Sequence, residues 1–407
     1  MWYKPYGKSG KAVSAIGFGG MRFNKKDPAA TTPEYDLDAC AEVVLEGRRL
    51  GINYFDTAPF YCDDHSEIIM GHSFRQMKAE GLGMPGSIGT VDSRPVYVST
   101  KSGEKDGAKL RAQLEKSLER LGVPKITFFN IWCIIDMADF QSRMVKGGAY
   151  EAAIKAKQEG LIEHVVFSTH CNGAEIATIV GEGLFDGVTL GYNILNFRFR
   201  RQGLVAAHQR GMGVVIMNPL AGGVIPQRAA KLDFLRGPHD PSVVEAAIRF
   251  DACHPEITVV LPGMGTLAEV RQNCAVGTSI GQALAVGTET PASLAAFASR
   301  RQIELETHLG DALDTLCTGC QYCLPCQVDI NIPKYLLSYN ERIFGKPGDA
   351  LNMMKWHWGG LTAGPAATCI ACGLCEERCT QHLPIISRLK EIVGWEDEAT
   401  QLAAATT

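Results

Sequence analysis

Short apolar runs alternate with longer amphipathic segments along most of the chain. Eight runs rich in Val, Ile and Phe predict strands, at Ala15–Phe18, Ile52–Phe55, Val96–Ser99, Ile126–Ile131, Val165–Phe167, Gly187–Leu190, Val214–Ile216 and Ile257–Leu261. Between them apolar residues recur every three or four positions, which predicts helices, most clearly at 109–121, 150–161 and 242–250. Strands that are apolar on both faces must be covered on both faces, so the pattern predicts a closed parallel (β/α)8 TIM barrel.

The pattern changes at both ends of this region. Residues 2–13 predict a β-hairpin in which Gly7 and Gly10 supply the turn. The repeats end near residue 280, so we expect the barrel to span 1–280. A helical connection is then expected over 281–310, a cysteine-rich α-helical domain over 311–395, and a frayed tail over 396–407.

Eight of the fourteen cysteines lie in two runs of the cysteine-rich domain. The runs are Cys317, Cys320, Cys323 and Cys326, followed by Cys369, Cys372, Cys375 and Cys379. In two-cluster ferredoxins, three cysteines of a run ligate one 4Fe–4S cluster and the fourth ligates the other cluster. The pattern therefore predicts a ferredoxin-like domain in which Cys379 completes the first cluster and Cys326 completes the second.

Two features loosen this match. The first run has two residues, not three, before its last cysteine, and Gln327 and Thr380 stand where ferredoxins usually carry proline. A pair of zinc sites is the main alternative, since zinc also takes four thiolates. A third cysteine at the same interval in both runs favours iron and sulfur. A disulfide framework is disfavoured, because nothing in the sequence indicates an oxidising compartment.

Composition narrows the range of partners. The formal net charge is −4 and no Lys/Arg-rich block is present, so we expect no nucleic-acid partner. No run approaches the length of a membrane span and the N-terminus has no signal-peptide segment, so we expect a cytoplasmic protein without a membrane partner. The six remaining cysteines are scattered, as reduced core thiols are.

Polar residues that follow the strands would line the mouth of the barrel. Asp56 ends the second strand, Tyr61 follows in its loop, and Lys101 ends the third strand. A phenol has an ordinary pKa of ~10, which a neighbouring ammonium lowers, and an aspartate keeps a buried lysine charged. Each residue alone has an ordinary explanation, since an Asp-Thr pair often caps a helix and a lysine at a strand end is often only solvated. Together they predict a proton donor for a carbonyl oxygen whose carbon receives a hydride.

The order of several motifs resembles that of aldo/keto reductases with a C-terminal ferredoxin-like extension. The motifs are Ile16–Arg22, Asp56–Ala58 with Tyr61, Ser66–Glu67, Ser99–Lys101, Pro219–Gly223 and Leu261–Met264. The resemblance implies that Tyr61 is the general acid, that Lys101 activates it and that Asp56 partners Lys101.

The resemblance also implies a fourth catalytic residue, usually a histidine, at the end of the fourth strand. This chain has Trp132 there, and an indole N–H can orient a carbonyl oxygen but cannot exchange a proton. His170, at the end of the fifth strand, is a candidate substitute, with a surface or supporting role as the alternative.

The cofactor implied by the resemblance is an extended nicotinamide dinucleotide across the barrel mouth. The segments expected to touch it contain Gly20, Arg22, Ser168, Asn193, Pro219, Gly222, Gly263, Met264, Glu269 and Asn273. Ser168 and Asn193 would bind the carboxamide. Glu269 stands where an arginine for a 2′-phosphate is usual, which favours NAD, whereas Arg271 keeps NADP open. Nicotinamide transfers two electrons together as a hydride, whereas each cluster accepts one electron. A flavin could mediate between the two, so it stays an alternative cofactor.

Three functions fit these features. The first is an iron–sulfur oxidoreductase that interconverts a carbonyl and an alcohol with a nicotinamide cofactor and exchanges electrons through two 4Fe–4S clusters. The second is an electron-transfer subunit that docks a ferredoxin or another redox protein. The third is a redox-neutral epimerase or dehydratase that keeps its nicotinamide tightly bound.

Overall fold

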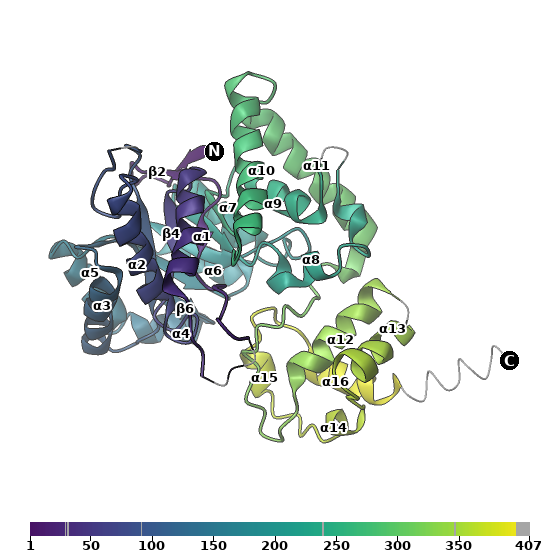
Figure 1. The fold of residues 1–407 in the computed structure, drawn as a ribbon. Coiled ribbons are helices and arrows are strands. Elements are labelled where there is room, and N and C mark those ends of the chain that lie inside the picture. The colour runs from purple at the N-terminus through teal and green to yellow at the C-terminus, as the bar shows by residue number, and fades with distance from the viewer. Residues whose placement is uncertain (29, 31, 91, 238–239, 346, 396–407) are drawn as a thin grey trace. The chain divides into compact units, whose positions relative to one another are not determined.

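The computed structural model describes residues 1–395 except 29, 31, 91, 238, 239 and 346, and the tail expected over 396–407 lies outside the described residues (Figure 1). The chain forms two compact units. The first comprises Met1–Ile194, Phe199–Pro219 and Val244–Ile303. The second comprises Leu195–Arg198, Leu220–Val243 and the described residues from Glu304 onward. The second unit therefore includes two segments from the middle of the chain as well as the cysteine-rich region.

An eight-stranded parallel sheet forms the centre of the first unit. Its strands are β3 (Phe18–Gly19), β4 (Tyr54–Asp56), β5 (Tyr97–Ser102), β6 (Ile126–Ile134), β7 (Ile162–Thr169), β8 (Gly187–Gly191), β9 (Gly213–Met217) and β10 (Val259–Leu261). Each strand pairs with its neighbour in sequence. Single parallel bridges from Ile16 to Val260 and from Gly19 to Gly263 join the two edges of the sheet. The predicted (β/α)8 barrel is confirmed.

Helices connect the strands and follow the last one. Between strands lie α1 (Leu37–Arg49), α2 (Ser66–Ala79), α3 (Gly107–Leu121), α4 (Met137–Arg143), α5 (Ala149–Gln158), α6 (Gly173–Gly181), α7 (Arg201–Gln209) and α9 (Val243–Cys253). After β10 come α10 (Leu267–Ala285) and α11 (Pro291–Leu309). In α3 the side chain of Asp106 caps the first turn, and Gly122 ends the helix with φ 64°. The expected connection over 281–310 is helical but interrupted, because α10 ends at Ala285 and α11 begins at Pro291.

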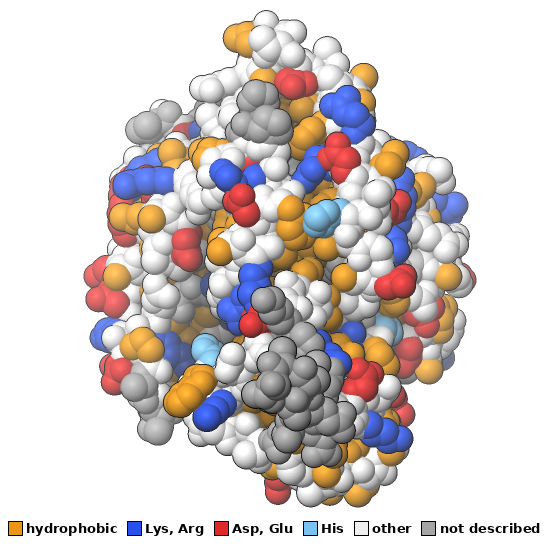
Figure 2. All heavy atoms as spheres, turned by 90° about the vertical axis from the view of Figure 1, so that its right-hand side faces the viewer, with side chains coloured by type: hydrophobic (Ala, Val, Ile, Leu, Met, Phe, Trp, Pro, Cys, Tyr) orange, Lys and Arg blue, Asp and Glu red, His pale blue; other side chains and the backbone are white. Residues whose placement is uncertain are grey.

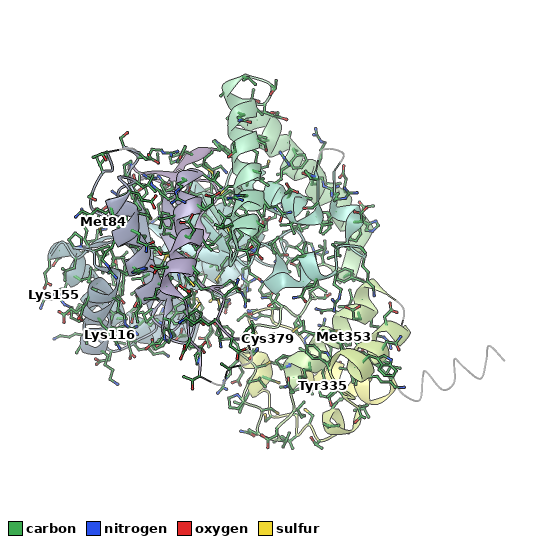
Figure 3. All side chains as sticks on the ribbon, viewed as in Figure 1. Met84, Lys116, Lys155, Tyr335, Met353 and Cys379 are labelled. Atoms are coloured by element: carbon green, nitrogen blue, oxygen red, sulfur yellow. The ribbon has the colours of Figure 1, made fainter. Side chains whose placement is uncertain are left out.

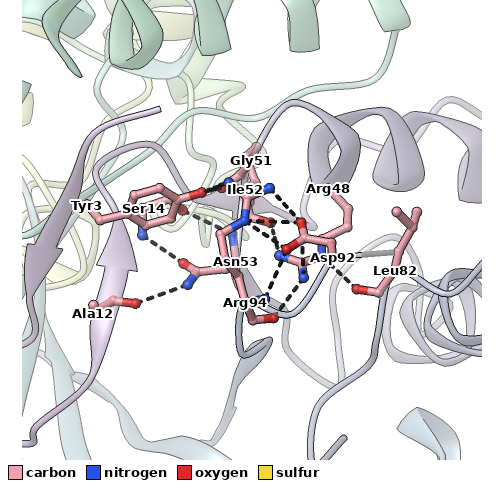
Figure 4. Close-up of polar contacts among 10 residues, drawn as sticks. All are labelled: Tyr3, Ala12, Ser14, Arg48, Gly51, Ile52, Asn53, Leu82, Asp92 and Arg94. Atoms are coloured by element: carbon pink, nitrogen blue, oxygen red, sulfur yellow. Dashed lines mark hydrogen bonds and ion pairs between the residues drawn. The ribbon is translucent and has the colours of Figure 1, made fainter. Parts of the chain in front are cut away.

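The N-terminal hairpin closes the amino-terminal end of the barrel. Its strands β1 (Tyr3–Pro5) and β2 (Ala12–Ser14) are antiparallel, as predicted. Tyr6 is fully buried, and its ring centroid lies 4.0 Å from that of Phe128 inside the barrel. Asn53, which precedes β4, bonds the hairpin at Ala12 and Ser14, as Figure 4 shows. The hairpin is thus part of the barrel's core.

The second unit is mainly helical. It contains α8 (Val224–Gln227), α12 (Ile332–Phe344), α13 (Pro347–Asn352), the π-turn η4 (Met353–His357), α14 (Gly364–Ala367), α15 (Leu374–Glu377) and α16 (Ile385–Val393). Its core joins Tyr335 and Leu336 of α12 to Leu389 and Ile392 of α16. Figure 3 labels Tyr335 and Met353 on these elements. Five cysteines of the two runs pack against this core, so the helices support both runs.

The surface carries charges of both signs. Figure 2 shows Lys and Arg side chains interspersed with Asp and Glu on one face, in keeping with the small net charge. Among the described residues, no helix has both the length and the apolar character that a membrane crossing requires.

Candidate active site and cluster-binding region

A buried ion pair lies at the carboxyl ends of two neighbouring strands. Asp56 of β4 pairs in register with Ser99 of β5, and Lys101 follows on β5. The Lys101 Nζ atom lies 2.5 Å from Oδ1 and 2.6 Å from Oδ2 of Asp56. Ser99 Oγ donates a third hydrogen bond to Oδ1, at 2.8 Å. Lys101 is 2% exposed and Asp56 4%, so water does not screen the pair.

A polar network in the barrel interior holds this pair in place. Asn130 of β6 donates through Nδ2 to Ser99 Oγ, at 3.0 Å. Its Oδ1 accepts from Thr189 Oγ1 of β8, at 3.1 Å. The network thus reaches across the interior from β4 to β8. Sequence reasoning missed Asn130 and Thr189, although an asparagine between Phe129 and Ile131 in an apolar strand was a signal.

Tyr61 lies beside Lys101 and Trp132. The Lys101 Nζ atom is 5.5 Å from the centroid of the Tyr61 ring. The indole ring of Trp132 meets the Tyr61 ring edge-on, with centroids 6.0 Å apart. Phe60 stacks on Trp132 at 5.9 Å and is 58% exposed. The structure therefore brings together three of the residues predicted for catalysis and adds Phe60, which sequence reasoning missed.

A bulge in β6 sets the direction of Trp132. The pairing of β6 with β7 shifts register between Ile131 and Ile134, and Cys133 between them has φ 63°. The Cys133 N–H donates to Ser168 Oγ of β7, at 3.1 Å. The bulge leaves Trp132 half-buried beside Tyr61. Ser168, expected at the carboxamide, also supports this bulge.

His170 is half-buried and follows β7 directly. Its backbone N–H donates to the carbonyl of Ile134, at 2.9 Å, and its carbonyl accepts from Arg200 Nη2, at 3.0 Å. Its backbone is therefore fixed at the carboxyl end of β6.

Residues near the first strand have packing roles. A Cβ atom on Gly20 would lie 2.9 Å from the carbonyl oxygen of Asp56, and the Gly20 N–H donates to that oxygen at 2.8 Å. A Cβ atom on Gly263 would lie 2.4 Å from Cγ of Arg22. Both glycines are thus needed for close approach, and the Arg22 side chain crosses Gly263.

Other residues expected at the dinucleotide are buried. Asn193 is 1% exposed and donates through Nδ2 to the carbonyl of Asn218, at 3.1 Å. The same burial is found for Pro219, Met264 and Asn273.

Glu269 caps α10. Its Oε2 atom accepts from the backbone N–H groups of Gly265 and Thr266, at 2.8 and 3.0 Å. Thr266 returns a bond to the N–H of Glu269, which completes a capping box. Arg271 is exposed and bonds Glu46 through Nε at 2.7 Å. The acidic residue at 269 thus has a structural explanation that needs no cofactor.

Gly222 belongs to the second compact unit. It has φ 68°, and a Cβ atom there would lie 2.1 Å from the carbonyl oxygen of Thr318. The loop after β9 therefore packs directly against the residue that follows Cys317.

The cysteines of both runs come together in the second unit. Burial raises the pKa of the Cys317 thiol to about 12, and charge on Cys320, Cys379 and Cys323 raises it as well. One cavity of the second unit is lined by Cys326, Cys369, Cys372 and Cys375, and also by Cys323 of the first run. The backbone N–H groups of Gly319 and Leu383 donate to the sulfurs of Cys317 and Cys379, each at 3.4 Å.

This arrangement fits two cubane clusters. Within the described part of the chain, no three His, Cys, Asp or Glu side chains lie close enough to hold a single metal ion. A cube of iron and sulfur spreads its thiolate ligands more widely than one zinc ion does, so cysteines at this separation suit clusters better than zinc.

The fold and these sites define the class of protein, an oxidoreductase built on a (β/α)8 barrel with an iron–sulfur extension. The chain belongs to the aldo/keto reductase family, whose profile matches residues 15–280. A second profile, that of a 4Fe-4S dicluster domain, matches residues 316–384.

Known proteins resemble the chain at modest identity. It is 26% identical over 310 residues to L-galactose dehydrogenase of Arabidopsis thaliana, which covers 70% of this chain and 90% of that protein. It is 25% identical over 231 residues to NADH-specific methylglyoxal reductase of Escherichia coli, with 54% and 68% covered. An aldo-keto reductase structure from Bacillus halodurans aligns with TM-score 0.57 and 20% identity, over 74% of this chain and 96% of that chain. The structural likeness supports the fold.

Proposed function

We propose that the barrel interconverts a carbonyl compound and an alcohol, with Tyr61 as general acid and base. The observation that carries this proposal is the buried ammonium of Lys101, bound by both carboxylate oxygens of Asp56 and 5.5 Å from the Tyr61 ring centroid. A fixed cation next to a phenol is the arrangement that proton transfer to a carbonyl oxygen requires.

A bound nicotinamide nucleotide would supply the hydride to the carbonyl carbon, or accept it from the alcohol. In reduction the Tyr61 hydroxyl gives its proton to the carbonyl oxygen, and the Lys101 ammonium stabilises the negative charge left on the phenol oxygen. Asp56 and the Ser99 hydroxyl hold the lysine in place. A proton from solvent then restores Tyr61, and oxidation of an alcohol reverses these steps.

Trp132 would shape the substrate site. Its N–H can donate to the carbonyl oxygen, but the indole cannot exchange a proton as a histidine does. Because its ring lies between those of Tyr61 and Phe60, we expect flat or small substrates to fit best. His170 remains the candidate for a second proton-exchanging group.

The nucleotide would lie along the strand-end segments that contain Ser168, Asn193, Pro219 and Gly263. NAD and NADP are both retained, since Glu269 is engaged in the cap of α10 and Arg271 is exposed. Flavin is the alternative cofactor.

The two cysteine groups would hold two 4Fe–4S clusters, which supply one-electron chemistry. Cys320 and Cys372, one thiol in each group, are exposed. An edge of each cluster near solvent would allow electron exchange with a ferredoxin or another redox protein. We place the protein in the cytoplasm, where such thiols stay reduced.

The test is Tyr61→Phe, assayed without oxygen against a panel of aldehydes and alcohols with NAD(H) and NADP(H). General acid catalysis contributes typically ~10²–10⁴-fold, so we expect turnover to fall at least about a hundredfold while nucleotide binding persists. Tyr150→Phe is the matched control. Tyr150 lies on the barrel helix α5, and the substitution removes a hydroxyl that donates to the carbonyl of Leu184. Equal turnover in the Tyr61 variant and the control would refute the assignment.

A further inference from the structure

A chain of three side-chain hydrogen bonds joins the loop after β8 to a cluster cysteine, all within the second unit. Asn196 Nδ2 donates to Gln381 Oε1 at 2.6 Å. Gln381 Nε2 donates to Thr380 Oγ1 at 3.2 Å. The Thr380 hydroxyl lies 3.4 Å from Cys320 Sγ. We call these three residues, Asn196, Gln381 and Thr380, the relay.

The relay is buried and anchored at its far end. Asn196, Gln381 and Thr380 are 6, 8 and 3% exposed. The carbonyl of Leu195 accepts from the Asp314 N–H at 3.0 Å, and Arg198 pairs with the Asp314 carboxylate at 3.1 Å. The loop Leu195–Arg198 is thus held to the segment just before Cys317 on both sides of Asn196.

All the bonds of the relay point the same way. A cysteine that ligates iron is a thiolate and only accepts, so Thr380 donates to it, and the Thr380 oxygen accepts from Gln381. Hydrogen bonds that run in one direction polarise each other. A donor at a ligand sulfur stabilises the more negative, reduced form of a cluster and so raises its reduction potential. Proline at position 380 would have no hydroxyl to give.

The other end of the relay has an acceptor without a partner. The Oδ1 atom of Asn196 is buried and makes no hydrogen bond among the described residues. Leaving a buried carbonyl oxygen unsatisfied costs free energy, so such an atom indicates a missing donor.

We propose that the relay sets the reduction potential of the cluster held by Cys317, Cys320, Cys323 and Cys379. The three relay members are positioning residues, since they act through Cys320. The proposal rests on the iron–sulfur clusters proposed above.

The first experiment measures both cluster potentials by an anaerobic redox titration followed by electron paramagnetic resonance. Thr380→Val keeps the shape of the side chain and removes the hydroxyl. We expect one of the two reduction steps to move to lower potential, with an equilibrium constant reduced about tenfold, which is 59 mV for a one-electron couple. Thr380→Ser retains the hydroxyl and should restore the step.

The matched control is Thr368→Val, which precedes a cysteine of the second group. Its hydroxyl bonds the carbonyl of Pro365 at 2.8 Å, so both reduction steps should stay in place. Unchanged steps in a Thr380→Val protein with wild-type iron content would overturn the relay. An equal shift in Thr380→Ser would overturn it too, and a Thr380→Val protein that loses iron is decided by the Asn196 variant below.

The second experiment measures the same potentials in Asn196→Leu, which removes the bond from Asn196 to Gln381 at the far end of the relay. We expect the same reduction step to move to lower potential, by less than in Thr380→Val. Unchanged steps in an Asn196→Leu protein with wild-type iron content would refute the role of Asn196 in the relay.

Discussion

Replacing Lys101 by methionine tests the ion pair at the centre of the site. Methionine keeps the length of the side chain and removes its charge. The carboxylate of Asp56, which is 4% exposed, would then keep one hydrogen bond among the described residues, from the Ser99 hydroxyl. Removing one partner of a buried pair costs ~3–5 kcal/mol, because the other charge is left without compensation. At about 2–4 °C per kcal/mol, the melting temperature should fall by roughly 10 °C.

A second substitution separates stability from catalysis. Asp56→Asn in the Lys101→Met background removes the stranded charge, so most of the lost stability should return. Turnover should not return, because both proteins lack the cation beside the phenol, and we expect it to stay about a hundredfold below wild type. Circular dichroism melts and anaerobic turnover on the same samples provide both readings. If the double variant regained turnover along with stability, Lys101 would have only a structural role.

Three further predictions concern other parts of the chain. Trp132→His should raise the rate at which simple aldehydes are reduced. Because Trp132 is half-buried, the substitution should lower the free energy of unfolding by less than the ~3 kcal/mol of a fully buried large-to-small change. An unstable protein without new aldehyde activity would contradict this. Cys326→Ser should lose about four of the eight irons expected for two 4Fe–4S clusters, all from the cluster of the second cysteine run, by iron analysis and resonance spectra; loss of the other cluster would show that the ligands are not crossed. Burial raises the pKa of Asp251 well above its usual range, and neither of its oxygens has a partner among the described residues. In the folded protein Asp251 then keeps its proton, whereas in the unfolded protein it loses that proton above the ordinary aspartate pKa of ~3.9. The free energy of unfolding of the wild type, measured by urea denaturation, should therefore fall relative to that of Asp251→Asn as pH rises from 4 to 8. A difference between the two proteins that stays constant over this pH range would refute the prediction.

The sequence predicted the barrel and the meeting of Asp56 with Lys101 for the same physical reason. Apolar runs of strand length indicated where the strands lie, and parallel strands place their carboxyl ends at one edge. Asp56 and Lys101 therefore had to meet once β4 and β5 were neighbours. The 4Fe–4S domain was predictable as well, because the cysteine spacing within each run is local in sequence, whereas the crossing of the fourth ligands stays a prediction.

Features that depend on irregular backbone or on distant segments were not predictable. The bulge that turns Trp132 toward Tyr61 leaves no mark in an apolar run, and the contact of Phe60 depends on the same bulge. Gly222 meets Thr318 only after two distant segments have folded together. The role of Glu269, by contrast, was predictable. Thr266 lies three residues before it, and this spacing is typical of a capping box, which explains the acidic residue without a cofactor.

The inclusion of Leu195–Arg198 and Leu220–Val243 in the same compact unit as the cysteine runs has a consequence for inheritance. A gene fusion that merely appended the cysteine region to another barrel of the family would bring Gln381 and Thr318 without loops made to receive them. We therefore expect both loops and the cysteine region to vary together among relatives. Among relatives, an asparagine at the position of Asn196 should occur together with the cysteine runs and be lost with them.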